Sequence, residues 1–257
     1  MCLILFAYHY HPEYKLILIA NRDEFYHRPT RPMQYWPDQP HLLAGKNLEQ
    51  GGTWLGLTRN GRFSALTNYR NGLLQPQGYR SRGHLPLDFL LSDQRCDAFI
   101  RHTNTQAFNG FNQLIDDGEQ LCYLSNQADT LQPVPTGIHG ISNAVFDTPW
   151  PKLVAAKQAL KNTLDRQPFS ADSLIQLMQD PTTYSDEELP NTGIAVALER
   201  QLSASFIRSE HYGTRATTAL LIKHDGSTTV VEQNYDAQGT GERHHFCFDA
   251  QSALMTE

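Results

Sequence analysis

Short apolar and β-branched runs separated by tight turns recur along this chain of 257 residues, and they favour antiparallel sheets. The clearest turn is Asn60-Gly61, because this step supplies the positive φ angles that a tight hairpin needs. Asp225-Gly226 predicts a similar turn near the end of the chain. Three hairpins are expected: residues 3–8 with 15–20, 53–58 with 62–67, and 216–223 with 229–233.

Helical periodicity lies between these hairpins. Leu87, Leu90 and Leu91 open a helix that runs toward residue 100. A second helix has Pro151 in its first turn and an apolar stripe, and a third starts at Ser170 as N-cap. The stripe consists of Leu153, Ala156, Leu160 and Leu164. Further short strands are predicted at residues 112–115, 120–124, 139–142 and 244–248.

The order of elements is therefore strands, helix, strands, two helices and strands. This order favours an α+β fold with two antiparallel sheets between helical layers, and disfavours an alternating parallel fold. Residues 26–51 are rich in Pro, His and Gln and lack a period, which predicts a long surface loop. We expect one domain over residues 1–257, because no linker or repeat interrupts the chain.

Composition excludes several classes of function. With 40% hydrophobic and 19% charged residues, the chain has the composition of a globular protein. A net charge of -6 argues against a nucleic-acid partner, which needs a basic surface. The apolar runs are too short for a transmembrane segment, and the first residues do not fit a secretory signal. We therefore expect a cytoplasmic protein whose four scattered cysteines are thiols.

Cys2 follows the initiator Met1, which methionine aminopeptidase removes when the second residue is small. Removal would leave Cys2 as the first residue, with a thiol and a free α-amine. The amine titrates near ~7.7–8.0, so it is partly neutral at cell pH and can take the proton of the thiol. The alternative interpretations are a small buried hydrophobe at the head of a strand and a palmitoylation site.

Polar residues directly follow the apolar run 16–20, at Asn21-Arg22-Asp23-Glu24. Arg22 could hold a thiolate in its charged form, while Asp23 or Glu24 could orient the α-amine by a hydrogen bond. An exposed charged turn is the alternative.

Three more polar side chains stand at predicted strand ends. Asn68 and Asn143 could donate to an oxyanion, and the alternative is that each is a turn residue. Arg215, in Tyr212-Gly213-Thr214-Arg215, could bind substrate or steady the nucleophile. A surface ion pair of small energetic effect is the alternative for Arg215.

Together, these segments resemble the NRDE family, the family of transport and Golgi organisation protein 2. The resemblance rests on Met1-Cys2 before a strand, the run Asn21-Arg22-Asp23-Glu24, Gly51-Gly52-Thr53-Trp54-Leu55-Gly56, and Tyr212-Gly213-Thr214-Arg215. More distantly, the same positions are similar to the choloylglycine hydrolase and acid ceramidase group of N-terminal nucleophile (Ntn) hydrolases. That similarity implies a four-layer αββα sandwich.

The resemblance also implies roles. Cys2 matches the nucleophile, Asn68 the oxyanion amide, Asn143 a second amide and Arg215 a late arginine. The hydrolase group has Arg-Asn-x-Asp early in the chain, whereas the order here is Asn21-Arg22-Asp23-Glu24. Either Arg22 with Asp23 or Asn21 with Glu24 therefore faces Cys2, and on a strand these choices point to opposite faces.

Two classes of function follow from this resemblance. In the first, Cys2 attacks an amide or acyl thioester of a small hydrophobic substrate, and water releases the acyl group while Asn68 and Asn143 hold the oxyanion. In the second, the protein is a non-catalytic carrier of haem, or of acyl-coenzyme A or lipid, that uses the same pocket.

Neither function requires a cofactor, and haem would be a ligand. Its axial ligands could be Cys2 or a histidine, and the candidates are His9, His11, His27, His244 and His245. No histidine or cysteine group has the spacing of a zinc site, so we predict no metal. The residues expected to line the pocket are Asn21, Glu24, Trp54 and Tyr69, with Tyr35 and Trp36 as further aromatic candidates.

Overall fold

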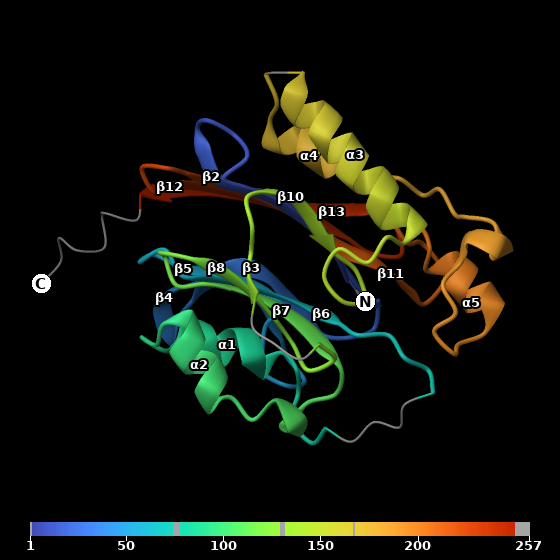
Figure 1. The fold of residues 1–257 in the computed structure, drawn as a ribbon, viewed down its shortest axis with the longest axis horizontal. Helices are drawn as coiled ribbons and strands as arrows, with labels where there is room; N and C mark the ends of the chain where they lie inside the picture. Colours follow the sequence, from blue (N-terminus) through green and yellow to red (C-terminus); the bar gives the residue numbers. More distant parts are fainter. Residues whose placement is uncertain (1, 74–77, 129–131, 167, 250–257) are drawn as a thin grey trace, which may run out of the picture.

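Two antiparallel sheets lie face to face in the structure, a computed structural model that describes residues 2–73, 78–128, 132–166 and 168–249 (Figure 1). Sheet A has the order β10 (Gly137–Ile141), β1 (Cys2–Tyr8), β2 (Tyr14–Phe25), β11 (Tyr212–Lys223), β12 (Ser227–Tyr235), β13 (Thr240–Asp249). Sheet B has the order β3 (Thr30–Trp36), β4 (Gln39–Asn47), β5 (Leu55–Thr58), β6 (Phe63–Asn68), β7 (Phe111–Asp116), β8 (Leu121–Ser125), β9 (Gln132–Pro133).

Helices cover the outer face of each sheet (Figure 1). α3 (Pro151–Asp165) and α4 (Ala171–Leu177) pack on sheet A, while α1 (His84–Leu90) and α2 (Cys96–His102) pack on sheet B. α5 (Val196–Gln201) lies beyond the edge of the layers, and two 3₁₀ turns occupy Thr105–Ala107 and Asp186–Glu188. The predicted α+β fold, a four-layer αββα sandwich, is confirmed.

Strand β1 shows why the central strands are apolar throughout. Its side chains alternate between two cores, because successive residues of a strand point to opposite faces. Ile4 and Phe6 enter the core between the sheets, whereas Leu3 and Leu5 enter the core under α3 and α4. A strand buried on both faces needs an unbroken apolar run, and residues 3–8 and 16–20 supply one each.

Several local predictions are confirmed. Gly61 (φ 86°) and Gly226 (φ 89°) take up the positive φ angles expected at the hairpin turns. The side chain of Ser170 accepts a hydrogen bond from the backbone N–H of Ser173 at 3.2 Å and caps α4. The predicted apolar stripe of α3 is buried against sheet A.

Other predictions are wrong. Residues 26–51 are not a surface loop, because they hold β3 and β4. β3 is the outermost strand of sheet B, a position that tolerates Pro32 and half-exposed polar residues and therefore hides the strand pattern. The single helix expected from Leu87 is two short helices, α1 and α2. The run at 21–24 lies within β2 and does not follow its end.

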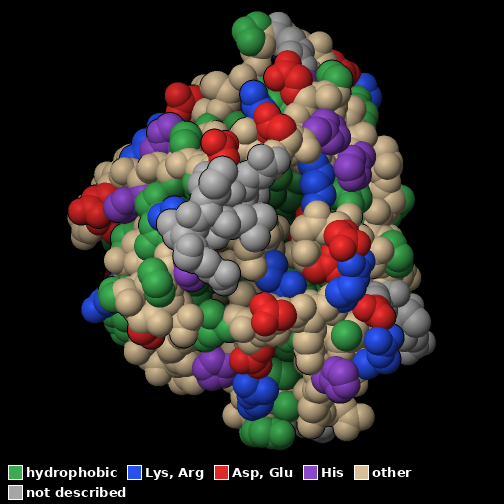
Figure 2. All heavy atoms as spheres, turned by 90° about the vertical axis from the view of Figure 1, so that its left-hand side faces the viewer, with side chains coloured by type: hydrophobic (Ala, Val, Ile, Leu, Met, Phe, Trp, Pro, Cys, Tyr) green, Lys and Arg blue, Asp and Glu red, His purple; other side chains and the backbone are tan. Residues whose placement is uncertain are grey.

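On the face shown in Figure 2, acidic and basic side chains lie intermixed.

All four cysteines are free thiols. In the part of the chain that the structure describes, no helix is both long and apolar enough to cross a membrane.

Candidate active site

Cys2 is the first residue of β1 and pairs with Arg22 of β2 in the middle of sheet A. Its half-buried thiol lies at a cavity of about 110 Å³. Residues from β1, β2, β4, β6 and three connecting segments line this cavity: Cys2, Arg22, Asp23, Glu24, Arg28, Asn47, Thr53, Trp54, Leu66, Asn68, Ser81, Arg82 and Gly83. The sequence-predicted residues Cys2, Arg22, Asp23, Glu24, Trp54 and Asn68 therefore meet at one place.

Strand alternation decides which residues of β2 face the cavity. Asn21 lies on the face toward the helices, where its amide donates to the carbonyls of Met178 at 2.9 Å and Ser205 at 2.8 Å. Arg22 and Glu24 lie on the opposite face with Cys2, and their closest charged atoms are 3.9 Å apart. Neither predicted pair shares a face, and the assignment of Asn21 as a substrate contact is wrong because its side chain is buried in the helix-facing layer.

Arg22 is held between Glu24 and the indole of Trp54. Its guanidinium lies 4.1 Å from the centre of the Trp54 ring, and a side chain at Gly45 would overlap that ring. Burial lowers the pKa of Arg22, while the nearby Glu24 and Cys2 oppose this shift. The cation is therefore fixed beside the thiol by stacking and has little freedom to move.

Asp23 reaches the cavity from the other side of β2. A register shift between Thr214 and Ala216 of β11 brings the Thr214 hydroxyl to the Asp23 carboxylate, to which it donates at 2.8 Å. Tyr212 donates to the Asp23 carbonyl at 3.0 Å. Burial raises the pKa of Asp23, and Lys152 works against this shift.

The surroundings of the Cys2 thiol favour its neutral form. Burial raises the pKa of Cys2, and the Asp23 carboxylate raises it further, while Arg22 and the backbone N–H of Asp23 lower it. A neutral thiol is a weak nucleophile, so a thiol in this position reacts only with a base that removes its proton.

Asn68 and Asn143 have different positions. Asn68 ends β6 and lines the cavity. Asn143 lies behind it, where its amide donates to the Asn68 carbonyl at 2.7 Å and its own carbonyl accepts from the Arg70 N–H at 2.7 Å. Asn143 does not line the cavity, and its geometry is that of a residue that positions Asn68.

Arg215 sits in the register shift of β11 and does not line the Cys2 cavity. Its guanidinium donates to the carbonyls of Phe25 at 2.9 Å and Tyr26 at 3.1 Å, which fixes the chain after β2. Arg215 lines a neighbouring cavity of about 240 Å³, and Arg22 and Trp54 form the wall between the two.

The Gly51-Gly52 step explains how a distant loop reaches the site. Gly51 has a φ of 73°, and a Cβ on Gly52 would lie 2.5 Å from the backbone of Gly83. The N–H of Thr53 donates to the Gly83 carbonyl at 2.9 Å. This close approach brings Arg82 to the cavity, a residue that the sequence analysis missed because only the packing of two loops places it there.

A buried polar cluster behind Asp23 was also missed. Lys152 of α3 donates to the Leu202 carbonyl at 2.8 Å, and Arg70 forms an ion pair with Glu199 of α5. Burial lowers the pKa of Lys152 to about 8, although Asp23 opposes this shift. The sequence signals neither interaction, because each joins segments that are far apart in the chain.

Lys152 should make stability depend on pH. Its pKa of about 8 in the fold is below the ordinary lysine value of 10.5, so between these pH values the unfolded chain binds more protons and the free energy of unfolding increases as pH rises. The difference amounts to about 3 kcal/mol, present as a penalty below pH 8. Urea titrations from pH 7.5 to 10 should show Lys152→Met losing this rise relative to the wild type. Parallel pH profiles of the two proteins would contradict the assignment.

The haem-ligand candidates are scattered. Of those named above, Cys2 lines the cavity, whereas His9 follows the opposite end of β1 and stacks on His224. His27 lies just beyond β2 with its ring centre 5.4 Å from that of Phe25, and His245 lies on the edge strand β13 beside Cys247. The described residues contain no group of three or more His, Cys, Asp or Glu side chains that could hold a metal ion. Tyr69 lines a separate, larger cleft.

The family model and the relatives most similar in sequence carry the same family description. The family model described as Transport and Golgi organisation 2 matches residues 1–237. The Transport and Golgi organization protein 2 homologs of Bos taurus and Homo sapiens are each 34% identical, over 91% of this chain and 93% of theirs. The Drosophila melanogaster protein is 26% identical over 99% of this chain and 100% of its own. A Caenorhabditis elegans N-acylethanolamine-hydrolyzing acid amidase ortholog superposes with a TM-score of 0.49 and 13% identity, over 86% of this chain and 92% of that one.

Proposed function

Because the chain belongs to the Transport and Golgi organisation 2 family and its Cys2 shares a cavity with Arg22, Asp23 and Asn68, we propose that it hydrolyses acyl amides or acyl thioesters with Cys2 as an N-terminal nucleophile. The convergence of these four side chains on one small cavity carries the proposal. A structural cysteine at the head of a strand needs no such neighbours.

The first half of the reaction forms an acyl-enzyme. After removal of Met1, the α-amine of Cys2 takes the thiol proton, and the sulfur attacks the carbonyl carbon of the substrate. Asp23 accepts a hydrogen bond from the amine and orients it, and the Asn68 amide donates to the oxyanion. The C–N or C–S bond then breaks, and the leaving group takes the proton from the ammonium.

The second half releases the acyl group. Water gives a proton to the α-amine and attacks the thioester at Cys2, which yields a carboxylic acid and restores the thiol. Arg22 supplies positive charge beside the sulfur in both halves of the reaction. The sulfur attacks as a thiolate in the first half and leaves as a thiolate in the second. Arg215 and Asn143 do not contact the substrate. Arg215 holds the chain after β2, and Asn143 holds the backbone of Asn68.

Cavity size limits what fits beside Cys2. About 110 Å³ is below the ~300–1,000 Å³ of ordinary ligand pockets, so this space takes the reacting carbonyl and little more. The apolar acyl chain can extend past Trp54 into the neighbouring 240 Å³ cavity, which Pro32 and Tyr235 also line.

Asn68→Ala tests the proposed oxyanion donor. Loss of one preorganised donor should lower kcat by about 10²- to 10³-fold with little change in KM. The assay is fatty acid release from an acyl amide and an acyl thioester with the same chain. Asn162→Ala, an exposed amide on α3, serves as the matched control. Unchanged kcat in Asn68→Ala, or no fatty acid release by the wild type, would contradict the proposal.

A haem carrier is the competing function, and we place either activity in the cytoplasm. Titration with haem separates the two. A Soret band of defined stoichiometry that Cys2→Ala alters would favour the carrier. The hydrolase proposal predicts a spectrum that does not respond to this substitution.

A further inference from the structure

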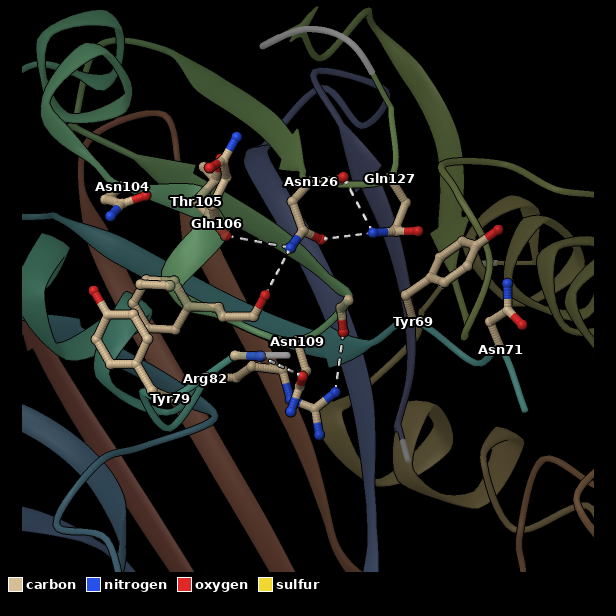
Figure 3. A pocket seen from close by; sticks show the side chains of 14 residues that line it. Tyr69, Asn71, Tyr79, Arg82, Asn104, Thr105, Gln106, Asn109, Asn126 and Gln127 are labelled. Atoms are coloured by element: carbon tan, nitrogen blue, oxygen red, sulfur yellow. Dashed lines mark hydrogen bonds between the residues drawn. The ribbon is translucent and has the colours of Figure 1, made fainter. Parts of the chain in front are cut away.

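Figure 3 shows a cleft of about 960 Å³. The cleft shares Arg82 with the lining of the Cys2 cavity. It lies over the segments that follow β6, α2 and β8, and 14 described residues line it. This volume is within the range of sites that bind a whole small molecule. The Cys2 cavity is much smaller, so a substrate that reacts at Cys2 must place most of its atoms elsewhere.

The two spaces share a wall. Arg82 lines both, and Asn68 of the Cys2 cavity is followed directly by Tyr69 of the cleft. The carbonyl of Gly110 joins these two sides, because it accepts from the Tyr69 N–H at 2.9 Å and from the Arg82 guanidinium at 3.0 Å. A molecule with its carbonyl at Cys2 can therefore continue past Arg82 into the cleft.

The charge of the cleft is unusual for this protein. Although the chain has a net charge of -6, no Asp or Glu is among the described lining residues, and Arg82 is the one charged side chain there. Arg82 also forms no ion pair with any described residue. A half-buried guanidinium with hydrogen-bonding capacity left over favours an oxyanion, which Arg can bind through two parallel N–H groups.

Other polar side chains that line the cleft are held by hydrogen bonds within the protein. Asn126 donates to the carbonyls of Thr105 at 3.3 Å and Phe108 at 3.1 Å, and Asn109 accepts from the Gly78 N–H at 2.9 Å (Figure 3). These bonds fix the shape of the wall before any ligand arrives. A preformed wall lowers the entropic cost of binding.

We propose that this cleft binds the non-acyl part of the substrate and that Arg82 selects substrates whose non-acyl part carries a carboxylate or phosphate. This inference rests on the proposed hydrolase function and names its substrate class. Arg82 acts as a specificity-determining residue: it contacts the anionic group and takes no part in bond breaking.

The test uses three probes with the same acyl chain: an N-acylglycine, an N-acylethanolamine and the phosphate ester of that N-acylethanolamine. Binding to Cys2→Ala, which cannot turn the probes over, is measured by calorimetry. The two anionic probes should bind about 10- to 100-fold more tightly than the neutral one. Arg82→Ala should abolish this preference, and Arg82→Lys should keep part of it. Arg200→Ala removes an exposed arginine of α5 as the matched control and should keep all of it.

Outcomes separate this inference from the function on which it rests. Equal affinity for the three probes, or a preference that survives Arg82→Ala, would overturn the role of Arg82. A preference for one anion alone that Arg82→Ala abolishes would still support the role of Arg82 and would identify which of carboxylate and phosphate the cleft takes. Anion-dependent binding without turnover by the wild type would overturn the hydrolase function and leave the binding site standing.

Discussion

Cys2→Ala should lower kcat/KM for an acyl amide by at least about 10³-fold, because alanine cannot form the acyl-enzyme. Alanine is small, so Met1 is still removed and the α-amine remains in place. The side chain is half-buried at the head of β1, so its loss should leave the fold intact. Fatty acid release at substrate concentrations well below KM measures the effect.

Cys247→Ala is the matched control for this prediction. Cys247 is an exposed thiol on the edge strand β13 and lines neither the Cys2 cavity nor the cleft. Its replacement should change kcat/KM by less than about twofold, as expected for a surface position. If Cys2→Ala kept more than a tenth of the wild-type rate, another group would be the nucleophile.

Glu199→Ala should destabilise the protein by about 3–5 kcal/mol, since it leaves the buried Arg70 guanidinium without its carboxylate. Both side chains are nearly inaccessible, at 3% and 6% exposure. Glu199 also accepts from the Thr192 N–H at 3.1 Å, a bond that the substitution removes. The free energy of unfolding from urea titration measures the effect.

The ion pair of Arg200 with Asp186 provides the comparison for Glu199. It lies on the same part of the molecule but is exposed at both ends. Asp186→Ala should therefore give no resolvable change in the free energy of unfolding. Equal losses in the two variants would show that burial of the Arg70–Glu199 pair has no special energetic role.

Because the backbone N–H of Arg70 donates to the Asn143 carbonyl, Glu199→Ala should also slow turnover.

The sequence predicts the central sheets well and their edges poorly. β1, β2 and β11 are buried on both faces, so their residues form apolar runs that are visible without a structure. The edge strand β3 buries only Met33 and Trp36, and its remaining residues resemble a loop. α5 buries a charged residue, Glu199, and so lacks the apolar stripe that identifies α3.

Some residues of the candidate site could likewise be predicted from the sequence, and others could not. Cys2, Arg22 and Asn68 could be predicted because each is a polar residue at or near the end of an apolar strand. Arg82 could not, because its position depends on contact between Gly52 and Gly83 across two loops. The sequence suggests an oxyanion contact for Asn143 and a substrate contact for Arg215, whereas both side chains donate to backbone carbonyls. Sequence patterns do not identify such partners.

Mass spectrometry of the N-terminal peptide tests the central claim most directly. The wild-type protein is incubated with an activated acyl thioester, quenched in acid and digested with pepsin at the same low pH, where the protonated α-amine cannot capture the acyl group. The N-terminal peptide is then sequenced. The proposal predicts that Met1 is absent, that the acyl group is on the sulfur of Cys2, and that hydroxylamine releases it. A retained Met1, or an acyl group found on Cys247 and absent from Cys2, would contradict the claim that Cys2 is an N-terminal nucleophile.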